Sequence, residues 1–131
     1  MKFADVIQTG EWKAEKHVPV IDAPDSVKAG EKVKIAVAVG KEISHPNTTE
    51  HHIRWIQLYF KPTDSKFAYD LGKFEFNAHG EAVAGANQGP VYTDPSAEVT
   101  VKITTSGTLL AASYCNIHGL WESAKEITVQ A

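Results

Sequence analysis

The sequence predicts an all-β protein, a sandwich or barrel of about seven short strands. Several segments alternate apolar and polar residues with a period of two, as half-buried strands do. Glycine and proline turn signals separate these segments, and the chain contains no internal repeat and no heptad pattern. Its 131 residues are the length of one ordinary domain, so we expect a single domain over residues 1–131.

The first half of the chain contains two clear strand signals and two weaker ones. Residues 1–19 show few strand signals and are expected to form an arm that leads onto the sandwich, with a weak strand at 18–21. Residues 32–39 alternate valine and isoleucine with lysine and alanine, which predicts a half-buried strand. Residues 53–60 are apolar on both faces, as a central strand would be, and 66–76 form a weaker candidate.

The second half supplies three more strands after a long connection. Residues 79–95 are rich in glycine, alanine and asparagine, and a loop of this length is usually functional or mobile. Strands are predicted at 97–104, 108–115 and 125–129. The total of seven short strands favours an immunoglobulin-like sandwich. A short helical turn within 44–52 is the one alternative to this all-β pattern.

The composition is that of a folded globular chain with a mild negative charge. Hydrophobic residues make up 43% and charged residues 22%, which argues against disorder. The 13 basic and 16 acidic residues give a net charge of -3, so no nucleic-acid partner is expected, because phosphate binding needs many lysines and arginines. The single cysteine, Cys115, excludes an internal disulfide and a four-cysteine metal site.

Membrane and export signals are missing from the sequence. No stretch approaches 18 consecutive apolar residues, so no membrane span is expected. The N-terminal segment has no apolar signal region, which predicts a cytoplasmic protein. In that compartment the thiol of Cys115 is expected to be reduced and available for chemistry.

One cysteine and one histidine stand three positions apart, in the segment Cys115-Asn116-Ile117-His118. At the end of a strand, such a pair can bring a thiolate and an imidazole to one metal ion. A thiolate is a soft ligand and an imidazole a borderline one, so the pair suits iron, copper or zinc rather than magnesium or calcium. A buried structural cysteine beside a surface histidine is the alternative for this pair taken alone.

Two further histidines, His45 and His51, lie six residues apart around a proline-containing turn. Pro46 favours an extended backbone at His45, and the turn can bring both imidazoles to one centre. In an extended chain His52 points away from His51, so at most one of these two should reach that centre. A polar loop tip is the alternative for this segment.

A carboxylate, a cation and an imidazole follow one another in Glu15, Lys16 and His17, directly before the first predicted strand. This order can place all three groups at one rim of a site, whereas the alternative is a solvated charged loop. His79 has no partner at ligand spacing and is expected to be a loop histidine.

Together these segments offer four imidazoles and one thiolate, one donor more than a tetrahedral zinc site uses. The five donors are His17, His45, His51, Cys115 and His118. Such a set with a sixth position open is typical of iron in small-molecule redox chemistry. A blue-copper electron carrier is the alternative, because it also combines a β-sandwich with cysteine and histidine ligands. Its usual axial methionine is missing, since the only methionine is Met1.

These motifs resemble those of the superoxide reductases, and most closely the one-iron, neelaredoxin-type enzymes of the desulfoferrodoxin superfamily. The resembling segments are residues 15–19, 45–53 and 115–121. Shorter matches at 78–80 and 91–95 extend the resemblance over nearly the whole chain. The two-iron relatives have an additional rubredoxin-like centre with four cysteines, which a chain with one cysteine does not contain.

The resemblance implies a role for each residue of the site. The four equatorial imidazoles fall on His17, His45, His51 and His118, and the axial thiolate falls on Cys115. The carboxylate that occupies the sixth position in the ferric state falls on Glu15. The cation beside the open position falls on Lys16.

The resemblance also implies an activity and its partners. It implies an enzyme that reduces superoxide to hydrogen peroxide at one mononuclear iron (Fe2+/Fe3+), as part of oxidative-stress defence. The electron would come from rubredoxin or a similar small donor, and the assembly would be a homotetramer. A cupredoxin-like copper protein for electron transfer is the alternative function.

Overall fold

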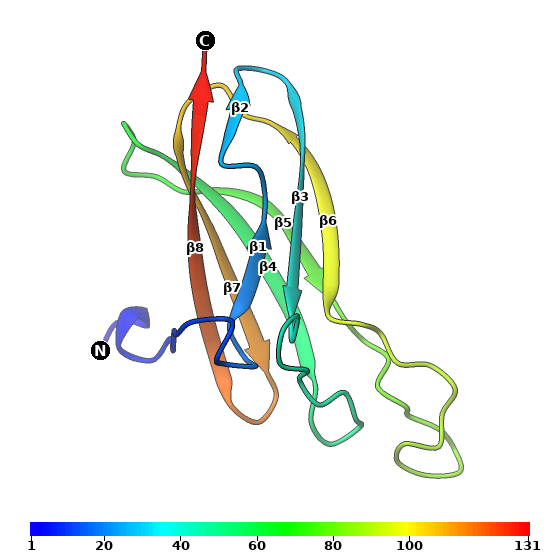
Figure 1. Cartoon of the computed structure of the whole chain (residues 1–131). Helices are drawn as coiled ribbons and strands as arrows, with labels where there is room; N and C mark the ends of the chain where they lie inside the picture. Colours follow the sequence, from blue (N-terminus) through cyan, green and yellow to red (C-terminus); the bar gives the residue numbers. More distant parts are fainter.

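The computed structural model describes all residues from 1 to 131, and it contains two β-sheets with an apolar core between them (Figure 1). The smaller sheet has the strand order β1-β3-β6, and the larger one has the order β2-β8-β7-β4-β5. The smaller sheet consists of β1 (Pro19–Asp22), β3 (Lys32–Val39) and β6 (Ser96–Lys102). The larger sheet consists of β2 (Ser26–Lys28), β4 (Ile53–Pro62), β5 (Tyr69–Glu75), β7 (Gly107–Cys115) and β8 (Gly119–Gln130). The predicted all-β sandwich is therefore confirmed.

Alternating side chains of the central strands build the core. In β3 the odd-numbered residues from Val33 to Val39 are buried, and their even-numbered neighbours face outward. In β7 the same alternation buries Leu109, Ala111 and Cys115. Because full burial of one large apolar side chain stabilises the fold by about 1.5–3 kcal/mol, these two faces supply much of the driving force for folding. The same alternation turns the sulfur of Cys115 inward, at the very end of its strand.

Most predicted strands are shifted at their ends by one to three residues, and two differences are larger. The structure has eight strands, because it adds β2, a three-residue strand that pairs in parallel with the end of β8. A strand so short shows no alternation, so the sequence contained no signal for it. β8 begins at Gly119 rather than at residue 125, because its first half pairs with β7 through a tight turn. The only helical segment is a 3-10 turn at Phe3–Asp5, so the predicted alternative of a helix within 44–52 is wrong.

Four connections meet at one end of the sandwich, the lower end in Figure 1. They are the N-terminal arm before β1, the loop from β3 to β4, the loop from β5 to β6, and the turn from β7 to β8. The arm lies along β8, because Gln8 donates its N–H to the Leu120 carbonyl and accepts from the Glu122 N–H. This end therefore gathers all five predicted donors. The structure contains no helix long and apolar enough to cross a membrane.

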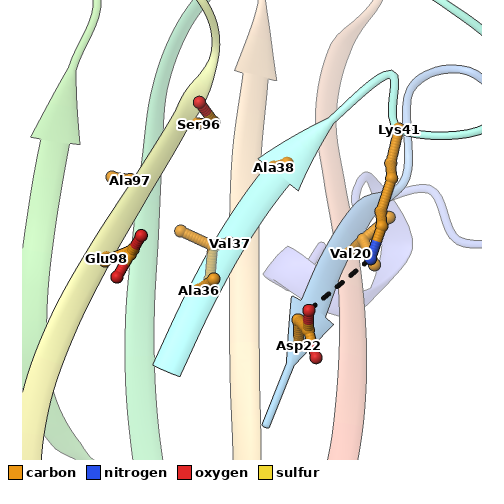
Figure 2. Close-up of a pocket in the computed structure, with 9 residues that line it drawn as sticks. All are labelled: Val20, Asp22, Ala36, Val37, Ala38, Lys41, Ser96, Ala97 and Glu98. Carbon is orange, nitrogen blue, oxygen red and sulfur yellow. Dashed lines mark ion pairs between the residues drawn. The ribbon is translucent and has the colours of Figure 1, made fainter. Parts of the chain in front are cut away.

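A hollow of about 580 Å³ lies on the three-stranded sheet, over β1, β3 and β6 (Figure 2). Its polar groups include Asp22 and Lys41, which form an ion pair at 3.6 Å (Figure 2). Its lining contains no histidine and no cysteine. This hollow is therefore not the site formed by the predicted metal-binding residues.

Candidate metal centre

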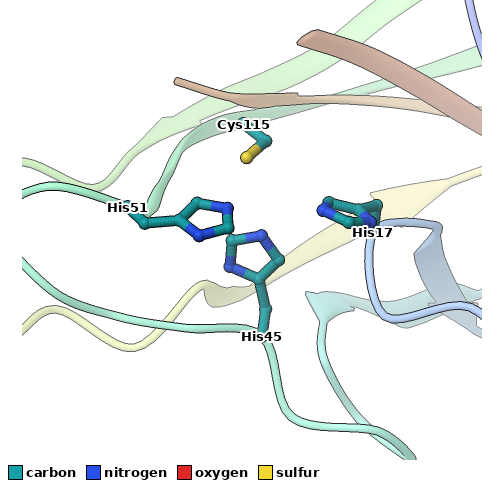
Figure 3. Close-up of side chains that lie close together, drawn as sticks. All are labelled: His17, His45, His51 and Cys115. Carbon is teal, nitrogen blue, oxygen red and sulfur yellow. The ribbon is translucent and has the colours of Figure 1, made fainter. Parts of the chain in front are cut away.

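Three imidazoles and one thiol meet at the loop end of the sandwich (Figure 3). One donor atom from each of His17, His45, His51 and Cys115 lies within 4.8 Å of the others. Figure 3 shows the Cys115 sulfur pointing toward the three rings. The residues come from three separate segments of the chain, so the group exists only in the folded protein.

His118 completes a closed set of four imidazole rings. The centroids of neighbouring rings are 4.9 Å apart for His17 and His45, 4.7 Å for His45 and His51, 5.0 Å for His51 and His118, and 4.7 Å for His118 and His17. The His118 Nδ1 atom lies 3.1 Å from His17 Nε2 and 3.8 Å from Cys115 Sγ. His118 thus turns Nδ1 toward the group. It is also exposed, which leaves this side of the group open to solvent.

Hydrogen bonds on the far side of two rings fix which nitrogen faces the group. His45 Nδ1 lies 2.6 Å from the Pro46 carbonyl oxygen and donates to it. His17 Nδ1 lies 2.6 Å from Glu15 Oε1. Because a neutral imidazole has one N–H and one lone pair, the Nε2 atoms of both rings then present lone pairs inward.

Two inward-facing nitrogens have no partner at all. His45 Nε2 and His51 Nε2 are buried and make no hydrogen bond. Buried polar atoms are almost always paired, and an unpaired one costs about 1–3 kcal/mol. Two such unpartnered nitrogens beside a buried thiol are what a bound metal ion would satisfy, so the donor set fits a metal centre of soft and borderline ligands.

The turn between β7 and β8 positions the sulfur. Cys115 ends β7 and pairs with Gly119 at the start of β8, across a three-residue connection. Gly119 has φ of +79°, a conformation that glycine adopts without strain. This geometry directs the backbone N–H of His118 to Cys115 Sγ at 3.4 Å. A donor aimed at sulfur stabilises the thiolate, the form that binds metals.

Burial keeps two histidines of the group, His45 and His51, in their neutral, metal-binding form. Burial lowers the pKa of His45 to about 4, and the positive charges of its neighbours contribute in the same direction. Burial also lowers the pKa of His51, again with nearby cations as further causes. Metal binding requires neutral imidazole, so both rings are ready to bind at neutral pH.

This burial predicts a pH-dependent stability for the metal-free chain. Folded His45 titrates at about 4 and an ordinary histidine at 6.5, so the unfolded state binds more protons between these values. Stability should therefore fall as the pH drops from 6.5 to 4, by up to roughly 3 kcal/mol from this residue. Urea unfolding of metal-free protein at several pH values measures the slope. His45→Asn should flatten it, and equal slopes for the two proteins would contradict the assignment.

Glu15 and Lys16 lie at the rim of the group, beside His17. Glu15 Oε1 accepts hydrogen bonds from the ring and from the backbone N–H of His17, and the ring hydrogen bond is the main reason that the pKa of Glu15 is lowered. In this structure Glu15 therefore orients a predicted ligand. Lys16 is half-buried and forms no ion pair. Its charge contributes to the lowered pKa values of His45 and His51, so its field reaches the group.

Two features of the site were missed from the sequence. The indole of Trp121 stacks on the His17 ring at 4.8 Å between centroids, and its Nε1 donates to the His118 carbonyl. His79 is only 3% exposed and stacks on His52, although the sequence suggested an unpartnered loop histidine. His52 turns away from the metal group and His51 joins it. No pattern in the sequence could show these ring stacks, because each joins residues that are far apart in the chain: His17 of the arm with Trp121 of β8, and His52 with His79 of another loop.

Comparisons with known proteins agree with this geometry. The family model described as desulfoferrodoxin matches residues 9–124. Neelaredoxin from Megalodesulfovibrio gigas is 55% identical over 130 residues, which cover 99% of this chain and 100% of the relative. Superoxide reductase from Pyrococcus furiosus is 54% identical and is covered to 99%, with 98% of this chain aligned. The solved structure of reduced Archaeoglobus fulgidus superoxide reductase (neelaredoxin) has a TM-score of 0.87 at 54% identity, covering 94% of this chain and 98% of that one.

Proposed function

The chain belongs to the desulfoferrodoxin family, and on this premise we propose that it is a superoxide reductase with one iron ion at the His–Cys group. The reaction consumes one superoxide, one electron and two protons and gives one hydrogen peroxide. The observation that most directly supports a metal at this position is the pair of buried, unpartnered Nε2 atoms of His45 and His51. Iron, when bound, would supply one-electron redox chemistry.

The proposed ligands are His17, His45, His51, Cys115 and His118. Four neutral nitrogens and one thiolate suit iron, and the solvent-exposed position of His118 supports access for a small anion. The copper alternative is not supported. The family match is to desulfoferrodoxin, and Met1, the only methionine, is fully exposed.

Lys16 and Glu15 are proposed to assist at the rim. Lys16 would attract the superoxide anion and organise water as a proton source, because its ammonium group is free of ion pairs and its field reaches the group. Glu15 would bind the iron in the ferric state only. Since its carboxylate now accepts from His17 Nδ1 at 2.6 Å, that ligation requires Glu15 to release the ring.

Two further proposals concern the partners. The electron would come from rubredoxin or a similar small donor, because the chain has no cysteines for a second redox centre. The assembly would be a homotetramer. An apolar hollow beside β4 and β7 supports self-association, since Phe3, Trp55 and Tyr114 line it and Phe3 is 74% exposed.

The metal and the reaction are tested together on purified protein. Elemental analysis of protein purified from cells without metal exchange should give one iron per chain. With an electron donor present, each superoxide consumed should yield one hydrogen peroxide, whereas a dismutase yields one for every two. Recovery of copper or zinc, or the dismutase ratio, would refute the proposal.

Replacing Glu15 separates its proposed role from that of the other residues. Glu15→Ala should leave the first encounter with superoxide nearly unchanged, because the carboxylate is proposed to bind only after oxidation. The visible spectrum of the oxidised protein, its pH dependence and its anion binding should change, since solvent then takes the place of the carboxylate. Stopped-flow and visible spectroscopy measure the two effects. A large loss in the initial rate with an unaltered oxidised spectrum would contradict this role.

A further inference from the structure

His79 is a buried histidine outside the metal group, and each of its polar atoms lies close to a polar partner. Its backbone N–H donates to Glu81 Oε1, and its carbonyl oxygen accepts from Thr49 Oγ1, both at 2.7 Å. Its ring Nε2 lies 2.7 Å from the Phe76 carbonyl oxygen, and its Nδ1 lies 3.1 Å from Asn47 Oδ1. Both oxygens are acceptors and a neutral imidazole has one N–H, so the ring donates to one of them at a time. Two of these partners, Asn47 and Thr49, belong to the loop between His45 and His51.

The orientation of Asn47 is fixed from its other side. Asn47 Nδ2 donates to the Thr93 carbonyl at 3.0 Å, so Asn47 Oδ1 is the atom that faces His79. Thr93 and His79 both lie in the long loop between β5 and β6. Two segments of this loop, at His79 and at Thr93, thus both contact the Asn47 side chain.

The ring of His79 also stacks on His52, the residue directly after His51. The two rings are 3.6 Å apart and nearly parallel, at 6°. His52 in turn donates from Nδ1 to the Thr48 carbonyl at 2.9 Å and from its backbone N–H to Asn116 Oδ1 at 2.8 Å. The stack therefore connects His79 to the loop of His45 and His51 and to the turn that follows Cys115.

Apart from the contacts of His79, the loop of residues 40–52 is restrained mainly by hydrogen bonds of Thr49 and Glu50 with Asn87 and of Glu50 and His52 with Asn116. It forms no strand, and its own backbone bonds are from Thr48 N–H to the His51 carbonyl and from Asn116 N–H to the His52 carbonyl. A loop with so few backbone hydrogen bonds depends on side-chain contacts for its conformation. The contacts of His79 are spread over this loop from Asn47 to His52.

We propose that His79 is a positioning residue for the metal centre, which holds the loop of His45 and His51 in its binding conformation through Asn47, Thr49 and His52. The inference rests on the proposed function only in taking His45 and His51 as ligands. Residues that orient metal ligands from outside typically change metal affinity or activity by about 10–100-fold when they are replaced. Since His79 acts through the loop rather than on a ligand directly, we expect an effect near the lower end of that range.

Two variants of His79 and one control test this role. His79→Phe keeps a flat ring for the stack but removes both ring nitrogens. His79→Gln can still donate to the Phe76 carbonyl and is the milder change. Ser96→Ala is the matched control, because it removes the hydrogen bond from Ser96 Oγ to Asp94 Oδ2 at the end of the same long loop, away from His79, Asn47 and His52.

The first measurement is the rate at which iron-loaded protein loses iron to a ferrous chelator. His79→Phe should release iron about 10-fold faster than wild type. His79→Gln should fall between the two, and Ser96→Ala should match wild type. The visible spectrum of the oxidised protein should shift in the His79 variants, because the ligand rings are held less firmly.

The second measurement is amide hydrogen exchange of residues 44–52 in metal-free protein. Exchange should be faster in both His79 variants and unchanged in Ser96→Ala. Wild-type iron release and wild-type exchange in folded His79→Gln would overturn the inference. If the wild-type chain bound no iron, the proposed function would fall, while exchange in the metal-free proteins would still decide whether His79 holds the loop.

Discussion

Replacing Cys115 by serine should remove the visible absorption of the oxidised protein and abolish its superoxide reductase activity. A thiolate gives oxidised iron a charge-transfer band, whereas a serine hydroxyl stays protonated and is a poor ligand for a soft site. Cys115 is fully buried, and serine is similar in size, so the change acts on the donor atom rather than on packing. We expect the loss of activity to exceed the roughly 10–100-fold that removal of a ligand's outer partners causes.

The control for this variant is Ala111→Ser, which places the same hydroxyl on the same buried face of β7. It should cost some stability, because a buried hydroxyl needs a partner, but the spectrum and the iron content should stay those of wild type. Visible spectroscopy, elemental analysis and pulse-generated superoxide measure the spectrum, the iron content and the activity of both variants. An unchanged visible spectrum in Cys115→Ser would show that the sulfur is not a ligand.

Replacing Lys16 by alanine should slow the capture of superoxide by about 10-fold and flatten its dependence on salt. The chain has a net charge of -3, so as a whole it repels the anion, and fast capture needs a local positive field. Lys16 supplies such a field, since its charge already contributes to the lowered pKa values of His45 and His51. Salt screens this attraction over about 10 Å at 0.1 M. Lys16→Glu should slow capture further and reverse the salt dependence.

Lys13→Ala is the matched control, because it removes the same charge three residues earlier in the arm. The Lys13 ammonium lies 5.4 Å from the Trp12 ring centroid and is not among the charges that shift the pKa of the site histidines. Its bimolecular rate should stay close to that of wild type, and iron content should be unchanged in all three variants. Identical rates and salt slopes for wild type and Lys16→Ala would rule out steering by Lys16.

The sequence predicted the parts of the fold that depend on local patterns. Residues 32–39 were predicted as a strand and form β3 with the same bounds, because valine and isoleucine alternate through the whole segment. Cys115 was predicted at a strand end, and β7 ends there. β2 could not be predicted, because its pairing with β8 depends on a partner about 100 residues away.

In the site, too, local sequence patterns could be read, whereas contacts between distant segments could not. Spacing and residue type were enough to select His17, His45 and His51, which the structure brings together with Cys115. Spacing could not reveal that Glu15 binds the far side of His17, because that contact depends on how the arm turns before β1. Nor could it reveal the stack of His52 on His79, whose rings come from two separate loops.

The wide separation of the donors along the chain has a consequence for biosynthesis. His17 and His118 are 101 positions apart in sequence, yet their ring nitrogens lie 3.1 Å apart. Pairings of such high sequence separation are slow to form, so the complete donor set arises only after both sheets have assembled. A nascent chain still lacking β7 offers three scattered imidazoles and no thiolate. The proposed iron would then be taken up after folding and would stabilise the finished fold by mass action, so the iron content of a preparation would measure the fraction of chains that have matured.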